Sequence, residues 1–250
     1  MLTHHPILQL QRNLYNLPKG RERFEAYLAL MKDPATGDIK LPLSGMNPMG
    51  HNHLADLLDA YLAMDVDGKA VEALKGWQSE PILQEAFANL NMQTAFVLAD
   101  DAKGQWTHRV AYEFDAIYHL KPLFRRGWLV ALLWSSEAAD SSRALTSLRQ
   151  TVYRGAWIAA HGHAATLGDL IHQEGWVAKK LGLAQQLEEE ELTFTHKILK
   201  PYWNSEDEPV LLAGIFGDEA ATKLGHPPLG LRSNAGIELG VSLNPQWNPS

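Results

Sequence analysis

Polar side chains that could bind or transform a small molecule follow directly on an apolar run. The stretch VLADDAKGQWTHR, residues 97–109, passes from apolar residues into two acids, a lysine and an arginine. One of Asp100 and Asp101 could act as a general acid/base or hold a metal, while Lys103 and Arg109 could neutralise an anionic ligand. Because adjacent residues leave a strand on opposite faces, we expect at most one of the two acids to face that ligand.

The same stretch also has a purely structural explanation. Asp and Gly are favoured where a strand runs into a helix, so the acids could cap that helix and Gly104 could form the turn. Trp106 would then belong to the core, and Arg109 would pair with Glu113 four residues later on the helix. The sequence leaves both explanations open.

A second polar segment, SGMNPMGHNH at residues 44–53, contains another candidate ligand contact. Asn47 before Pro48 is typical of a helix start, so capping is its structural explanation. In the functional explanation Asn47 donates hydrogen bonds to the ligand. Ser135, which follows a second apolar run, is assigned the same role.

Histidines suggest an alternative chemistry based on a divalent metal. The 11 histidines in 250 residues form two H-x-H pairs, His51 with His53 and His161 with His163, where chance alone gives about half a pair. On a helix, residues two apart point in nearly opposite directions, so the two histidines of one pair cannot bind the same metal ion. The alternative site therefore combines histidines from both pairs, His53 with His161 or His163, and adds Glu174. Capping or surface exposure is the structural explanation of the same histidines.

Several enzyme classes are excluded by what the sequence lacks. It contains no cysteine, which removes disulfides, thiol nucleophiles and iron–sulfur clusters. It also lacks the glycine-rich dinucleotide and P-loop signatures, the H-E-x-x-H zinc signature and the G-x-S-x-G nucleophile elbow. No cofactor is assigned beyond the metal of the alternative site.

Charge and hydropathy narrow the choice of partners. A formal net charge of −7 and a pI near 5.9 argue against nucleic acid. The longest apolar runs are shorter than the roughly 18 residues of a membrane span, and the first residues lack the order of a signal peptide. We therefore expect a soluble, cytoplasmic protein with a small-molecule ligand and an oligomeric state that the sequence does not determine.

Most of the chain has the 3.6-residue apolar period of helices. A clear stripe runs through residues 54–62, and a long helix is predicted over 142–160. Thr166 and Asp169 form a capping-box pattern ahead of a further helix. Helices therefore make up most of the predicted fold.

The apolar period changes in two short runs, TAFVLA (94–99) and GWLVALLW (127–134). Continuous apolar segments between turn residues are typical of strands buried on both faces. With the helical stripe between them they span about forty residues, the length of a parallel βαβ unit. A weaker third strand is DIKLPL (38–43). We predict a helix-rich α/β fold: a small sheet with one parallel βαβ unit, flanked by many helices.

The whole chain, 1–250, is predicted to form a single globular domain, because it has no repeat, low-complexity tract or linker. Residues 226–250 are rich in Pro, Gly and Asn. We expect them to be mostly coil that wraps the surface.

These elements place the polar residues at one edge of the sheet. The loops after parallel strands lie together at the carboxyl edge, where open α/β sheets bind ligands. Asp100 and Asp101 would then lie near Ser135, and Asn47 would join them if 38–43 is a parallel strand. The sequence predicts binding of a small polar, anionic molecule there, with hydrolytic or transfer chemistry if the protein is an enzyme. The alternatives are a metal-dependent hydrolase and a non-catalytic scaffold or partner-binding protein.

Overall fold

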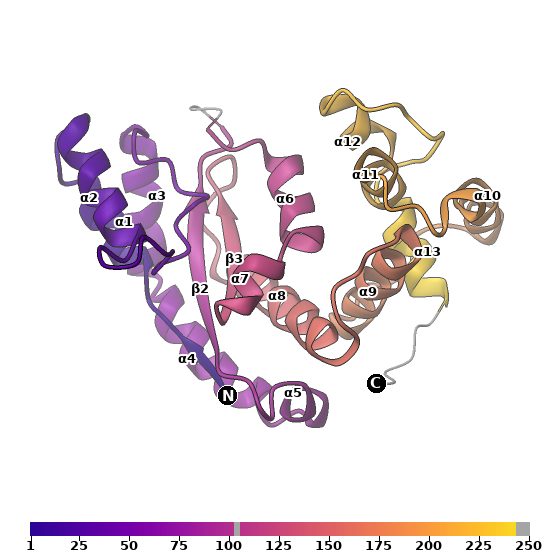
Figure 1. Cartoon of the computed structure of the whole chain (residues 1–250), viewed down its shortest axis with the longest axis horizontal. Helices are drawn as coiled ribbons and strands as arrows, with labels where there is room; N and C mark the ends of the chain where they lie inside the picture. Colours follow the sequence, from indigo (N-terminus) through magenta and orange to yellow (C-terminus); the bar gives the residue numbers. More distant parts are fainter. Residues whose placement is uncertain (103–105, 244–250) are drawn as a thin grey trace. The chain divides into compact units, whose positions relative to one another are not determined.

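The described part of the chain consists of many helices and one small parallel sheet (Figure 1). The computed structural model describes the whole chain except residues 103–105 and 244–250. Contacts within the chain divide it into two compact units, residues 1–112 with 122–152 and residues 113–121 with 153–250. The single domain expected from the sequence stays a prediction.

The first unit contains the sheet. Its strands are β1 (Leu2–His4), β2 (Met92–Ala99) and β3 (Trp128–Trp134). Its helices are α1 (Leu8–Leu14), α2 (Arg21–Met31), α3 (Asn52–Ala63), α4 (Val66–Trp77) and α5 (Pro81–Ala86).

Three helices have residues in both units: α6 (Arg109–Tyr118), α7 (Lys121–Arg125) and α8 (Ser141–His161). The second unit further contains α9 (Leu167–Lys180), α10 (Glu189–Leu199), the short 3₁₀ helix η1 (Lys200–Tyr202), α11 (Glu208–Phe216), α12 (Asp218–Lys223) and α13 (Ala235–Leu243). The capping box predicted from the sequence is present at the start of α9, where the Thr166 and Asp169 side chains each accept hydrogen bonds from the other's backbone N–H.

The predicted parallel βαβ unit is confirmed. β2 and β3 pair in parallel, with Ala99 opposite Trp134 at their carboxyl ends. The third strand was predicted wrongly: β1, at Leu2–His4, pairs in parallel with β2, whereas Ile39 of the predicted segment makes only an isolated antiparallel bridge to Lys32. Three residues are too few to show a strand period, which is why the sequence pattern did not reveal β1.

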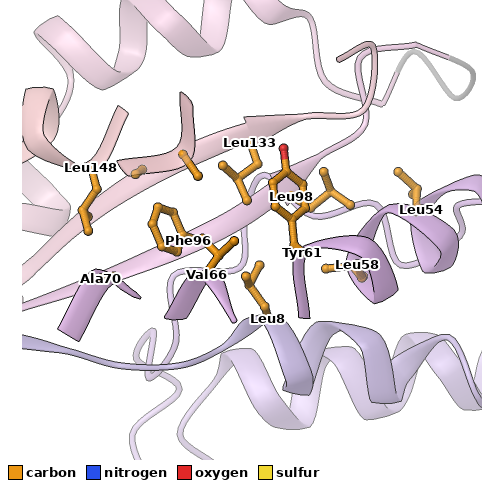
Figure 2. Packing of buried hydrophobic residues seen from close by; sticks show 12 residues of the cluster. Leu8, Leu54, Leu58, Tyr61, Val66, Ala70, Phe96, Leu98, Leu133 and Leu148 are labelled. Carbon is orange, nitrogen blue, oxygen red and sulfur yellow. The ribbon is translucent and has the colours of Figure 1, made fainter. Parts of the chain in front are cut away.

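Both faces of β2 are covered by apolar side chains, as its continuous apolar sequence predicted. Phe96 and Leu98 point to a cluster of buried residues from α3, α4 and α8 (Figure 2). Ala95 and Val97 point to a second cluster on the opposite face, together with Trp128 of β3. Side chains alternate between the two faces of a strand, so burial on both sides favours a nearly continuous run of apolar residues.

A glutamine side chain completes the edge of β2 beyond β1. β1 pairs only as far as Thr94, so the carbonyl of Phe96 and the N–H of Leu98 need other partners on that side. The fully buried Gln11 of α1 donates to the Phe96 carbonyl at 3.1 Å and accepts from the Leu98 N–H at 3.0 Å. Because unpaired buried backbone groups are costly, these two bonds hold the carboxyl half of β2 in place.

The C-terminal segment is only partly coil. Residues 226–234 contain neither helix nor strand, but the expectation of coil is wrong for α13. The glycines that suggested coil allow this helix to pack closely: a Cβ on Gly240 would lie 2.1 Å from the Ile171 carbonyl oxygen, and one on Gly236 would lie 2.1 Å from that of Gly214. Residues 244–250 lie outside the described part of the chain.

We expect Gly175→Ala in α9 to lower the free energy of unfolding by about 1–3 kcal/mol, because the added carbon would lie 2.2 Å from the backbone of Gly240 and a rigid backbone cannot move aside cheaply. The matched control is Gly76→Ala, on the exposed side of α4, where a Cβ meets nothing within 4 Å. That change should stabilise by about 0.5–1 kcal/mol. Denaturant unfolding measures both, and effects of the same sign would contradict the close approach of α9 and α13.

Candidate functional site

The ends of β2 and β3 bring two predicted site residues together. Since Ala99 lies opposite Trp134, Asp100 and Ser135 are the next pair in register. The Ser135 hydroxyl lies 3.0 Å from Asp100 Oδ1, and the Ser135 N–H donates to the Ala99 carbonyl at 3.0 Å. The predicted proximity at the carboxyl edge is therefore confirmed, and parallel pairing is its cause.

Asp100 is a fully buried carboxylate surrounded by donors from three segments. Asn47 Nδ2 donates to Oδ2 at 2.8 Å, while the Ser135 hydroxyl and His53 Nε2 lie 3.0 and 3.3 Å from Oδ1. Burial by itself would raise the pKa of Asp100, but the hydrogen bonds from Asn47, Ser135 and His53 outweigh it and hold that pKa below its ordinary value. Asp100 is therefore ionised at neutral pH.

Asn47 reaches Asp100 from a turn, not from a strand end or a helix cap. Its side-chain oxygen accepts from the Met49 N–H at 2.9 Å, which closes an Asx turn. The predicted helix start at Asn47–Pro48 is wrong, because α3 begins only at Asn52. The amide nitrogen of Asn47 is thereby directed to Asp100.

Tyr15, the residue that caps the carboxyl end of α1, supports this turn, since its hydroxyl donates to the Asn47 carbonyl at 2.6 Å. Burial, and then the charge of Asp100, raise the pKa of Tyr15. The phenol therefore keeps its proton and remains a donor. Arg23 lies over the Tyr15 ring at 5.3 Å and donates to the Gly50 carbonyl at 3.3 Å, which ties α2 to the same turn.

Asp101 occupies the partly exposed side of the edge. Its carboxylate accepts from the Ser136 N–H at 2.9 Å and from the Ser136 hydroxyl at 2.6 Å. Its own N–H, like that of Ala102, donates to the Ser135 hydroxyl oxygen. The two adjacent acids thus have different surroundings, one buried and one within reach of solvent.

Arg109, the predicted anion contact, already has an anionic partner. Its guanidinium lies 2.9 Å from Glu137 Oε1 and 5.1 Å from the ring centre of Trp134. Arg143 lies 3.1 Å from the other oxygen of Glu137. The other predicted anion contact, Lys103, lies outside the described residues.

The prediction that Trp106 belongs to the core is wrong, because 46% of its surface is exposed. The predicted helical stripe included Trp106, but α6 starts only at Arg109, so Trp106 precedes the helix. Gly104, the predicted turn residue, lies outside the described residues.

The candidate metal ligands are engaged in other contacts. Within the part of the chain that the structure describes, no three His, Asp or Glu side chains form a group that could hold a metal ion. His53 belongs to the Asp100 network of the first unit. Glu174 in α9 of the second unit forms a buried pair with Arg154, which donates Nε at 2.7 Å and Nη2 at 2.6 Å to its two oxygens.

The other H-x-H pair lies at the end of α8. His161 Nδ1 is 3.1 Å from the Trp157 carbonyl oxygen, and the two rings stack with centres 4.0 Å apart. His163 follows the end of the helix and is partly buried. We therefore do not propose a metal-binding role for His161 and His163.

Sequence reasoning missed Gln11, Tyr15 and Arg23, which support the site without being part of the polar stretches. One signal was present: Gln11 lies between Leu8 and Leu14 on the buried face of α1. A polar residue on an otherwise apolar helix face needs a buried partner. Which partner it finds depends on the strand beside it.

Comparison with known proteins finds no matching family, curated protein or solved structure. None of the helices in the described part of the chain is long and apolar enough to cross a membrane. The geometry at the carboxyl edge is therefore the basis for a functional assignment.

We expect Asp100→Asn to lower the free energy of unfolding at pH 7 by about 1.5–3 kcal/mol, because one donor would then face an amide NH₂. The folded-state pKa of Asp100 is lowered from 3.8, so its stabilisation is complete well above pH 3.8 and is lost as the pH falls through the folded-state value. The free energies of unfolding of the wild type and Asp100→Asn should therefore approach each other in acid.

Denaturant unfolding of both proteins between pH 7 and pH 3 measures this convergence. Asp101→Asn, at a partly exposed carboxylate, is the matched control and should have the smaller effect at pH 7. A difference between wild type and Asp100→Asn that does not change with pH would contradict the ionised state of Asp100.

Proposed function

We propose that the carboxyl edge of the sheet binds a small polar molecule beside Asp100, Asn47 and Ser135. One observation carries the proposal: polar side chains from separate segments converge on a buried carboxylate where two parallel strands end. Loops at such edges present free polar groups, which is why open parallel sheets bind ligands there. Keeping a carboxylate ionised in the interior is also costly, and such groups concentrate at functional sites.

The charges at this edge favour a neutral or cationic ligand. Among the described residues, Asp100 and Asp101 supply two carboxylates, while Arg109 and Arg143 both contact the carboxylate of Glu137. An anion would lie close to both carboxylates and would be repelled. The sequence predicted a small polar, anionic ligand. We therefore keep the small polar ligand in the proposal and replace the anion with a neutral or cationic molecule.

The state of Asp100 favours a role in ligand binding over a role as a general acid or base. A carboxylate whose pKa is held below its ordinary value is a weak base near neutral pH. We therefore propose Asp100 as an anchor that orients Asn47, His53 and Ser135, in place of the catalytic role considered for it. Hydrolytic or transfer chemistry would have to come from groups that Asp100 orients.

A structural role is the second candidate, and one observation favours it. Both oxygens of Asp100 already have partners within the protein. In this second candidate, the network has no ligand and serves to tie the strand ends to the 44–53 segment. The two candidates differ in whether any ligand depends on the network.

A thermal-shift panel of polyols, amino alcohols, amines, hydroxy acids and phosphates tests the proposal. We expect a polyol, amino alcohol or amine to raise the melting temperature, since a ligand at a hundred times its Kd adds about 2.7 kcal/mol of stability. Ser135→Ala should abolish this ligand-induced shift. Ser79→Ala, in the same unit with a hydroxyl that donates to Gly76, should leave it unchanged.

The ligand-induced shift is compared within each variant, so a change in basal stability does not affect the result. A panel in which no compound shifts the wild type would refute the binding proposal and favour the structural role. Equal shifts in Ser135→Ala and Ser79→Ala would place the ligand elsewhere.

A further inference from the structure

The two ring nitrogens of His53 have different surroundings. Nε2 lies 3.3 Å from Asp100 Oδ1, whereas Nδ1 is buried and has no hydrogen-bond partner among the described residues. The side chain as a whole keeps 16% of its surface exposed, so the ring lies between the buried network and solvent. A buried polar atom without a partner is rare in native proteins, and a functional role is one explanation for it.

In the neutral tautomer that carries its proton on Nε2, the nitrogen without a partner is an acceptor, so the group it lacks is a hydrogen-bond donor. Asp100 is ionised, so it accepts the N–H of His53 Nε2 and selects the tautomer with that proton. A neutral imidazole has one N–H, which leaves Nδ1 as an acceptor. The other charged or polar groups at this point, Asn47 and Ser135, direct their donors to Asp100.

His4 shows how a purely structural histidine is satisfied in the same unit. Its side chain has no exposed surface, and both nitrogens are used: Nδ1 lies 3.0 Å from the Thr94 hydroxyl and Nε2 lies 2.7 Å from Asp67 Oδ1. This histidine joins β1 to β2 and α4 and has no atom left for a ligand. His53 has the same carboxylate contact but lacks the second partner.

We propose that His53 Nδ1 is the hydrogen-bond acceptor of the ligand, and that the ligand is a neutral or cationic molecule with a hydroxyl or amino donor. The proposal rests on the proposed function and adds the hydrogen-bond donor that the ligand must carry and the atom that accepts from it. Asp100 acts as a positioning residue, because it fixes the tautomer and the orientation of the ring. Asp101 provides the negative charge nearby that disfavours an anion.

Two amide substitutions separate the two nitrogens. In His53→Gln the amide nitrogen replaces Nε2 and keeps a donor for Asp100, but no acceptor remains at the position of Nδ1. In His53→Asn the amide oxygen replaces Nδ1 as an acceptor, but the side chain no longer reaches Asp100. Binding should therefore weaken more in His53→Gln, and stability should fall more in His53→Asn.

Three two-carbon probes test the charge and the donor together: ethylene glycol, ethanolamine and glycolate. All carry a hydroxyl group, and they are neutral, cationic and anionic. Titrations are followed by NMR on protein with ¹⁵N-labelled histidine and backbone, so that imidazole nitrogens and backbone amides are observed in one sample. We expect ethylene glycol and ethanolamine to shift the His53 Nδ1 signal, and His53→Gln to weaken their binding roughly threefold to tenfold, the effect of one hydrogen bond.

The outcomes separate this inference from the proposed function. Probes that shift the amide signals of Ser135 and Ser136 but not His53 Nδ1 would overturn the role of His53 and leave ligand binding at the edge supported. Glycolate as the strongest binder would overturn the charge assignment. If no probe shifts His53 Nδ1, or if binding in both variants falls only in proportion to stability, His53 has a structural role and the inference is wrong.

Discussion

A carboxylate remains ionised inside a protein only when hydrogen-bond donors replace the water that it has lost. Asp100 meets this condition with donors from a turn, a helix and a neighbouring strand end, contributed by Asn47, His53 and Ser135. Each of these segments must therefore hold its position for the charge to be tolerated. The Asp100 network links the turn at Asn47, the start of α3 and the end of β3, so loss of one donor affects all three.

The supports of this network lie outside it. Gln11 replaces a missing strand partner along the edge of β2 and so fixes the backbone that leads into Asp100. Tyr15 holds the turn that carries Asn47, and its raised pKa keeps it protonated as a donor. Gln11 lies in α1 and Tyr15 is the residue that caps its carboxyl end. One short helix thus positions both the carboxylate and one of its donors, which makes the site dependent on packing between α1 and β2.

The predictable part of the site followed from local pattern and from one rule of topology. The apolar runs of β2 and β3 predicted two strands buried on both faces, and parallel pairing then placed Asp100 beside Ser135. Asn47 was expected there for the wrong reason, since 38–43 is not a strand and an Asx turn delivers its side chain. The exposure of Trp106 was missed because a helical period shows which residues could share a face but not where the helix begins.

The sequence by itself determined the class of fold, the two long strands and the polar residues that follow them, because these depend on periodicity and on neighbours along the chain. Only the tertiary structure decided that β1 is the third strand, that α13 is a helix packed through glycines, and that His53 joins Asp100. These features depend on contacts between residues far apart in sequence. Hydrogen-bond partners of that kind leave no periodic pattern, since a single buried donor needs only one acceptor at the right distance.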